Sequence, residues 1–317
     1  MLMTTARRVG RSLLVIFLVT VLAQLLLSLA PGSVAERILG EEATPESVAA
    51  LNTELGLDQP IWKQYTDWLG GALQGDFGNS LMTGQSVSDA IFERLPVSLE
   101  LSILGMGIAI VVAVSFAVMG ASRPDSMLDK FLNSITSVFL STPGFIAGPV
   151  LIYIFAVELG WFPVIGWNPM DQGLGMNLQT ALLPALAIAL QEIASLHRLL
   201  RADLLTTLGE DYIAAARAKG LSGTYVMFRH ALRPSSFSLM TVLGINMGRL
   251  LGGTVIVESL FALPGVGQLL VSSISSRDVI MVQGVVTFIA IIYVVMNMLV
   301  DVSYGVIDPR IRKVVAA

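Results

Sequence analysis

Two charged side chains accompany one of the long apolar runs of this sequence, and they are the first candidates for chemistry. Arg249 lies in the run from about residue 237 to 257, and Glu258 lies at its end. An ionisable residue at membrane depth usually faces a bundle interior or a water-filled cavity. Two interpretations stay open. Either Arg249 faces a water-filled path or a partner helix while Glu258 lies near the external interface, or one of the two contacts a solute directly. Both residues are therefore assigned to a candidate translocation pathway.

Residue counts exclude several catalytic chemistries. The sequence has no cysteine, and its histidines are His197 and His230. Disulfides, thiolate metal sites and cysteine nucleophiles are thus excluded, and a metal or acid–base centre built on histidine is not expected. A phosphate-binding loop requires Lys followed by Ser or Thr. The lysines are followed instead by Gln, Phe, Gly and Val, and they are Lys63, Lys130, Lys219 and Lys313. If transport is driven by a nucleotide, another chain must bind and hydrolyse it.

A polar segment near residues 210–221 has the signals of a short helix and a stop. Glu210 and Asp211 suit a helix N-terminus, where the dipole favours negative charge, and Arg217 and Lys219 suit its C-terminus. Gly220 suits the stop, because glycine tolerates a left-handed backbone. The strong helix formers in between are Ala214, Ala215 and Ala216.

A second short segment is predicted to begin at Leu221 and to end at Pro234. Ala215, Ala216 and Gly220 are predicted to offer a shallow face, and Ala216 and Gly220, four residues apart, are predicted to share one face of the helix. Small residues on such a face allow another surface to approach closely. The alternative interpretation is an ordinary loop between helices that alanine stabilises.

Composition places these segments in a membrane protein. The hydrophobic fraction is 54%, the charged fraction is 13% and the mean hydropathy is +0.76, whereas a soluble domain carries about 25% charged residues. A spanning helix needs about 20 mostly apolar residues. Six runs meet this length within a few residues, and they cover about 12–30, 97–119, 131–157, 178–196, 237–257 and 282–300. Pro143 and Pro149 predict that the third run is kinked. The alternative for the first run is a cleaved signal peptide, but the run is long for one.

The distribution of Lys and Arg predicts the orientation of these spans. With six spans, the basic segments fall on one side: they are the N-terminal tail, the loop after the second span, the loop after the fourth span and the C-terminal tail. Both termini are therefore expected in the cytoplasm, and the acidic segment 31–96 is expected outside. Apolar residues near 48–55 predict a short amphipathic helix there. Trp62, Tyr65 and Trp68 are predicted to form the small core of this external segment.

Further short motifs occur in order along nearly the whole chain. They are Leu-Gly-Leu-Asp-Gln-Pro at 55–60, Gly-Asp-Phe-Gly-Asn-Ser at 75–80, Arg-Leu-Pro at 94–96, Ser-Thr-Pro at 141–143, Arg-His-Ala-Leu-Arg at 229–233, Leu-Pro-Gly-Val-Gly at 263–267 and Asp-Pro-Arg-Ile-Arg at 308–312. With residues 211–220, this set resembles the dipeptide, oligopeptide and nickel permeases of binding-protein-dependent ABC importers. Two departures stand out: Ala214 replaces the acid of the coupling motif Glu-Ala-Ala-x-x-x-Gly, and Pro234 comes one residue late. The first removes any salt bridge of that acid, but not the docking role.

The resemblance implies an all-α type I importer permease fold with six transmembrane helices in the cytoplasmic (inner) membrane. It implies a lipid bilayer around the chain, a second homologous permease, two ATPase subunits and an extracytoplasmic substrate-binding protein as partners, with no nucleic acid. This chain would hold no cofactor, because ATP and Mg bind in the ATPase subunits. The ATPase-coupling loop would comprise Glu210, Asp211, Ala214, Ala215, Ala216, Arg217, Lys219, Gly220 and Leu221.

The expected organisation follows from the spans. Residues 1–30 form a cytoplasmic tail and the first transmembrane helix, and 31–96 form the external segment. Residues 97–306 form a five-helix permease core with its cytoplasmic coupling loop at 198–235, and 307–317 form a cytoplasmic tail.

Short peptides are the solutes that the resemblance favours, while nickel, haem or another small solute stay open. The absence of cysteine and the scarcity of histidine argue against tight metal coordination. A stand-alone channel or secondary carrier is the alternative class. A proton-coupled carrier usually needs a relay of buried acids. Besides Glu258, Glu100 opens the second run and Asp301 closes the sixth, and this is a sparse set for a relay.

Overall fold

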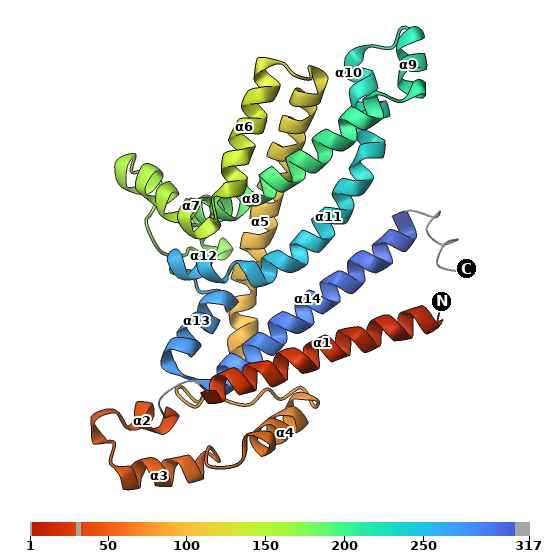
Figure 1. The fold of residues 1–317 in the computed structure, drawn as a ribbon. Coiled ribbons are helices and arrows are strands. Elements are labelled where there is room, and N and C mark those ends of the chain that lie inside the picture. Colours follow the sequence, from red (N-terminus) through yellow and green to blue (C-terminus); the bar gives the residue numbers. More distant parts are fainter. Residues whose placement is uncertain (1, 30–32, 308–317) are drawn as a thin grey trace. The chain divides into compact units, whose positions relative to one another are not determined.

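The computed structural model describes residues 2–29 and 33–307, and these residues are almost entirely helical (Figure 1). They divide into two compact units. Unit 1 comprises Met1–Ser98 and Pro264–Val294, and unit 2 comprises Leu99–Leu263 and Val295–Ala317. Apart from Ile307, the last residue of helix α14 (Val279–Ile307), the predicted C-terminal tail 307–317 lies outside the described residues.

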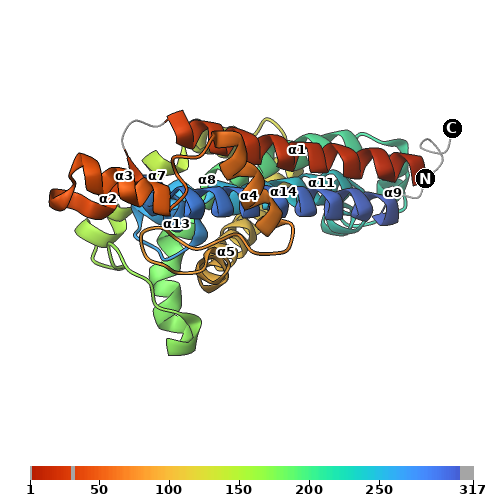
Figure 2. The same cartoon turned by 90° about the horizontal axis from the view of Figure 1, so that it is seen from below.

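Unit 1 combines one long helix with several short ones. Its elements are α1 (Leu2–Leu29), α2 (Val34–Leu39), the 3-10 turn η1 (Gly40–Glu42), α3 (Pro45–Glu54), α4 (Ile61–Ala72), the start of α5 (Val87–Ser122), α13 (Val266–Ser276) and the first part of α14 (Val279–Ile307). Helix α3 confirms the short helix predicted near 48–55, and Thr44 caps its N-terminus by accepting from the Ser47 N–H at 3.2 Å. Figure 2 shows α4 beside α1, and these two helices are in contact.

The core of unit 1 joins α5, α13 and α14. Its buried members are Val87, Ala90, Ile91, Val266, Leu269, Met281 and Val285. Gly284 allows the close approach of α14 to α5, because a β-carbon there would overlap the Val87 side chain. Segments far apart in the sequence therefore form one core.

Aromatic side chains connect α4 to its neighbours, but not as predicted. Tyr65 packs edge-on against Phe17 of α1, and its hydroxyl is 2.8 Å from Thr20 Oγ1. Trp68 packs near Tyr65 and donates from Nε1 to the Phe77 carbonyl at 3.2 Å. The prediction for Trp62 is wrong: it is 69% exposed. It lies three residues before Tyr65 in sequence, but its side chain is turned outward.

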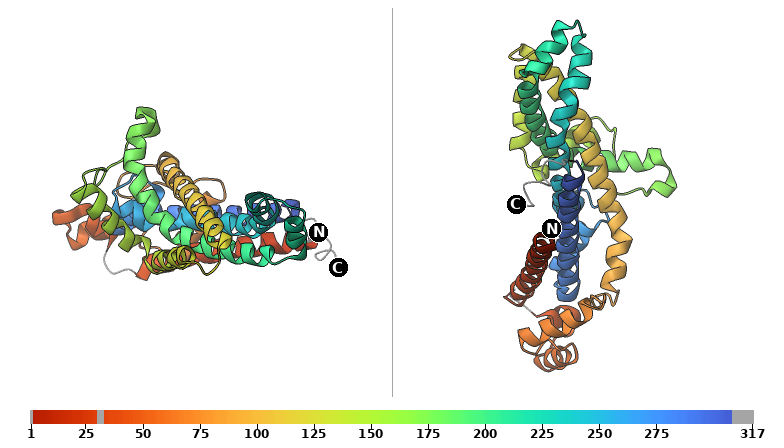
Figure 3. Two further views of the ribbon diagram at one scale, coloured as in Figure 1. Left: turned by 90° about the horizontal axis from the view of Figure 1, so that it is seen from above. Right: turned by 90° about the vertical axis from the view of Figure 1, so that its right-hand side faces the viewer.

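Unit 2 is a helical bundle built around α8. Its elements are the rest of α5, α6 (Met127–Ser141), α7 (Gly144–Leu151), the π-helical turn η2 (Ile152–Glu158), the 3-10 turn η3 (Met170–Gln172), α8 (Leu174–Leu208), α9 (Asp211–Ala218), α10 (Gly223–Tyr225), the π-helical turn η4 (Val226–Ala231), α11 (Leu232–Gly253), α12 (Val255–Leu260) and the end of α14. Helix α8 contacts α6, α7 and α11. Its first part runs in a different direction from the rest (Figure 3), and Pro184 lies inside it, where proline commonly causes a kink.

Small residues let the helices of unit 2 approach closely. A β-carbon at Gly105 of α5 would lie 3.2 Å from the Ala185 carbonyl of α8, and one at Gly148 of α7 would overlap Leu260. Close packing of small residues is a common way in which helices associate in membranes.

Four helices among the described residues are long and apolar enough to cross a membrane: Val9–Leu29, Val87–Ser122, Leu174–Leu208 and Val279–Leu299. Met127–Ser141 and Gly144–Glu158 pass only together and bend by 106° at their junction, which makes five if the pair is one span. The bend confirms the kink predicted from Pro143, which keeps Thr142 extended. The remaining predicted run falls in α11, which has 22 residues but is not among these helices. By length and composition, the described residues therefore provide four or five candidate spans, fewer than the predicted six.

Two predicted boundaries shift because helices are longer than their apolar runs. Helix α5 begins at Val87 and contains Pro96, so the predicted external segment 31–96 ends inside it. Helix α8 ends at Leu208, so the predicted loop 198–235 includes its last turns.

Candidate functional site

The predicted coupling segment forms helix α9 and a glycine turn. Glu210 is the N-cap residue, Asp211 lies in the first turn and Arg217 lies in the last turn, as predicted. These charges complement the helix dipole at both ends. Lys219 follows the last helical residue, and Gly220 has a φ of 81°, in the left-handed region that favours glycine. Within unit 2, α9 lies at the same end as the turn between α5 and α6 (Figure 1).

One face of α9 is buried and the other is exposed. Ile213 and Ala216 pack with Val226 of η4, and Leu208 of α8 covers them. The prediction that Ala216 contributes to a shallow face with Ala215 and Gly220 is therefore wrong, because Ala216 turns inward with Ile213, one helical turn earlier. All the other residues assigned to the coupling loop are exposed: Glu210, Asp211, Ala214, Ala215, Arg217, Lys219, Gly220 and Leu221.

The segment after Gly220 does not end at Pro234, which corrects the prediction. The chain stays helical from α10 through η4 into α11, and Pro234 lies in the first turn of α11. Proline has no N–H for the carbonyl of His230, four residues earlier. The Tyr212 hydroxyl of α9 donates to that carbonyl at 3.2 Å. Helix α9 is thus attached to η4, which leads into α11, through a backbone carbonyl to which the proline cannot donate.

Arg249, one of the two embedded candidates, belongs to a polar cluster that joins α11 to α8. Its Nη2 donates to Glu192 Oε1 at 2.6 Å, and Asn246 Nδ2 donates to Glu192 Oε2 at 2.6 Å. The Glu192 side chain is only 3% exposed, whereas the Arg249 side chain is 61% exposed. The sequence prediction missed Glu192, although an acid inside the apolar run 178–196 was a usable signal.

Glu258, the other embedded candidate, lies in α12 and is fully buried. Its Oε1 accepts from Thr254 Oγ1 at 2.7 Å. Burial of this carboxylate leaves Arg249 as the accessible member of the predicted pair.

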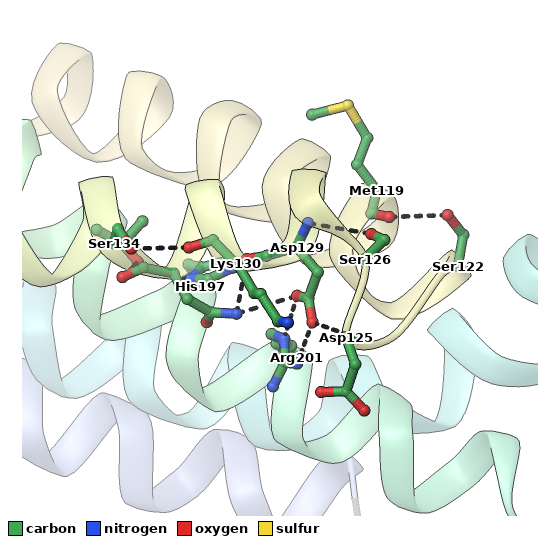
Figure 4. A network of polar contacts seen from close by, with 11 residues as sticks. Met119, Ser122, Asp125, Ser126, Asp129, Lys130, Ser134, His197 and Arg201 are labelled. Atoms are coloured by element: carbon green, nitrogen blue, oxygen red, sulfur yellow. Dashed lines mark hydrogen bonds and ion pairs between the residues drawn. The ribbon is translucent and has the colours of Figure 1, made fainter.

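A second ion pair joins α6 to α8, and the sequence prediction did not identify it. Arg201 holds the buried carboxylate of Asp129 with two hydrogen bonds, from Nε to Oδ1 at 2.7 Å and from Nη2 to Oδ2 at 2.6 Å (Figure 4). Asn133 Nδ2 and the Asp125 N–H also donate to this carboxylate, each at 3.0 Å. His197 lies one turn before Arg201, and its Nδ1 is 3.1 Å from Thr136 Oγ1. This arrangement fixes the ends of α6 and α8 nearest α9.

Gly120 of α5 leaves room for the carboxylate of that ion pair. A β-carbon at this position would lie 2.7 Å from Asp129 Oδ1. We therefore expect Gly120→Ala to lower the free energy of unfolding by about 1–3 kcal/mol, as overpacking typically does. Thermal unfolding of the purified protein in detergent measures this. Gly107→Ala is the matched control, because a β-carbon at this position of α5 has no neighbour within 4 Å. Equal effects of the two substitutions would contradict the prediction.

Unit 1 contains a pocket of approximately 470 Å³ between α1, the α3–α4 connection, α4 and the start of α14, with a mixed polar and apolar lining. Glu54, Asp67 and Asp76 line it together with Gln24 and Gln283. Its carboxylates do not form a metal site, since no group of three or more His, Asp or Glu residues in the described ranges is arranged to hold an ion.

Long apolar helices joined by ion pairs with buried carboxylates are typical of a multi-helix membrane protein, and the comparisons specify its class. Residues 105–313 match the family described as binding-protein-dependent transport system inner membrane component, and residues 1–102 match its N-terminal part. The chain belongs to this family. It is a permease subunit of an ABC importer.

Relatives cover nearly the full chain. A putative peptide transport system permease protein of Brucella abortus (strain 2308) is 40% identical over 96% of this chain and 98% of its own length. A probable peptide ABC transporter permease protein of Sinorhizobium fredii is 38% identical, with the same coverage of 96% and 98%. The glutathione transport system permease protein of Escherichia coli (strain K12) is 35% identical over 94% of each chain.

A solved structure of an amino acid ABC transporter with histidines has a similar fold. It superposes with a TM-score of 0.50 over 68% of this chain and 92% of that chain, at 17% identity. This likeness supports the fold alone.

Proposed function

We propose that this permease forms the translocation pathway for short peptides in an ATP-driven importer. The supporting observation is the set of full-length relatives, 35–40% identical, that are named for the transport of peptides or of glutathione, itself a tripeptide. In this proposal the chain hydrolyses no ATP. Two ATPase subunits bind ATP and Mg, a second homologous permease completes the pathway, and an extracytoplasmic binding protein delivers the peptide.

The proposed topology has six spans in the cytoplasmic membrane. Helices α1, α5, α8 and α14 are four of these spans. The bent pair α6–α7 and helix α11 are the other two. Both termini lie in the cytoplasm, and the segment before α5 lies outside. The excess of Lys and Arg in the loop that contains α9 supports this orientation.

Helix α9 is proposed to dock on an ATPase subunit through its exposed face. Closure of the ATPase dimer on ATP would move α9, and α9 is attached to its own bundle at two places. Ile213 and Ala216 pack on η4 and the end of α8, and Tyr212 binds the His230 carbonyl. Movement of α9 would therefore reach α8 directly and α11 through η4. Import follows because open and closed ATPase dimers favour different states of the permease.

Helix α11 is proposed to line the pathway. It is long enough to span a bilayer but less apolar than the four clear spans, which suits a helix with one face toward water. Arg249 is its exposed cation, and an arginine exposed to lipid would be costly. Glu258 supports the pathway from a buried position.

Uptake of a labelled tripeptide by intact cells tests the proposed function. Cells that carry the binding protein, both permeases and the ATPase subunits should accumulate the peptide, and omission of this chain should abolish accumulation. A matched culture that lacks only the binding protein controls for other peptide carriers. Normal accumulation without this chain would contradict the proposal.

A further inference from the structure

The Arg249 side chain is held by an ion pair and is nevertheless largely exposed. Its guanidinium is anchored at 2.6 Å to a carboxylate that is itself buried, yet 61% of its side chain remains exposed. An arginine in a spanning helix that faced lipid would be costly. The exposed part therefore faces either water or another protein chain.

The anchor fixes the direction of the guanidinium. Each oxygen of Glu192 accepts from a different residue of α11, Oε1 from Arg249 and Oε2 from Asn246. Asn246 is three residues before Arg249, on the same side of the helix. A guanidinium carries five N–H donors in a rigid fork, and the bond to Glu192 uses only one Nη2 hydrogen. The accessible donors are thus presented as an oriented group.

We propose that Arg249, positioned by Glu192 and Asn246, is a subsite that receives the terminal carboxylate of the peptide during its passage. An arginine fork matches a carboxylate through paired hydrogen bonds, and every unmodified peptide ends in a carboxylate. Glu192 also offsets the charge of Arg249, so the ligand is held weakly. Weak holding suits a pathway, where a site must admit its ligand and also release it. This inference rests on the proposed function.

The test compares a peptide acid with its amide. Trialanine and trialanine amide are supplied to the complete transporter in proteoliposomes, at concentrations that give equal occupancy of the binding protein. The wild type should take up the acid faster. Arg249→Gln should lower acid uptake about tenfold, the scale of one charge-assisted hydrogen bond, and should leave amide uptake unchanged. Arg249→Lys should retain part of the preference for the acid, because it keeps the charge but loses the fork.

Controls separate recognition from folding. Arg249→Gln leaves the buried Glu192 without a cation, so the double variant Glu192→Gln/Arg249→Gln removes both charges and should show the same loss of preference. Arg233→Gln removes another arginine from α11, at its other end, and should leave the acid-to-amide ratio unchanged.

Three results would overturn the subsite. They are a wild type that does not distinguish acid from amide, a double variant that keeps the wild-type preference, and loss of the second permease from the purified Arg249→Gln complex, which would place Arg249 in an interface between chains. A wild type that transports neither peptide would instead contradict the proposed function.

Discussion

Gly220→Leu is expected to abolish uptake and weaken ATPase association while leaving the amount of permease in the membrane unchanged. The backbone at Gly220 has a φ of 81°, and a side chain there would be strained by about 1 kcal/mol. No atom lies within 4 Å of an added β-carbon, so the permease itself can accommodate the bulk. A leucine would instead project from the exposed side of the turn after α9. Capture of the ATPase subunits by the tagged permease measures association, and labelled-peptide uptake measures transport.

Two further substitutions distinguish strain from lost docking. Gly220→Asn places a smaller residue that tolerates the left-handed backbone, so uptake should be largely retained. Ala214→Glu restores the acid of the related motif at an exposed position and should also be tolerated. If Gly220→Leu keeps both association and uptake, the segment is only a connector between α8 and α11.

Arg201→Leu is expected to destabilise unit 2 severely. It would leave the buried carboxylate of Asp129 without its cation, and breaking a buried pair from one side costs about 3–5 kcal/mol. The hydrogen bonds from Asn133 and from the Asp125 N–H remain, but neither supplies a charge. We expect a lower unfolding temperature and a lower yield of purified protein in detergent.

The double variant Asp129→Asn/Arg201→Leu is the control for this effect. It removes both charges while an amide oxygen can still accept from the Asp125 N–H. Much of the lost stability should return, because the cost arises from an unpaired buried charge and not from a missing contact. A single variant as stable as the wild type, or a double variant no more stable than the single, would contradict this account of the α6–α8 pair.

Local signals were sufficient to predict α9 and the bend at Pro143. Glu210, Asp211 and Gly220 act on the backbone within one or two turns, so their effect is readable from sequence. The inward turn of Ala216 was not predicted, because burial depends on Val226 and Leu208, which reach it only through the fold. Pro234 is similar: the helix continues past it, and the His230 carbonyl accepts from Tyr212 instead.

The polar pairs show the limit of sequence reasoning more clearly. Arg249 was identifiable as an embedded charge, but its partner Glu192 lies 57 positions away on another helix. Arg201 and Asp129 are 72 positions apart, and nothing local to either residue indicates the other. Such contacts depend on how the helices pack. From the sequence alone, each charged residue has many possible partners.

ATP-dependent accumulation of a labelled tripeptide in proteoliposomes tests the central claim most directly. The liposomes contain this permease, the second permease and the ATPase subunits, and the loaded binding protein is added outside. Accumulation above the external concentration should require enclosed ATP and the binding protein, and should persist when an ionophore removes ion gradients. Accumulation without ATP, driven by an imposed ion gradient, would show a secondary carrier and contradict the proposed ATP-driven import.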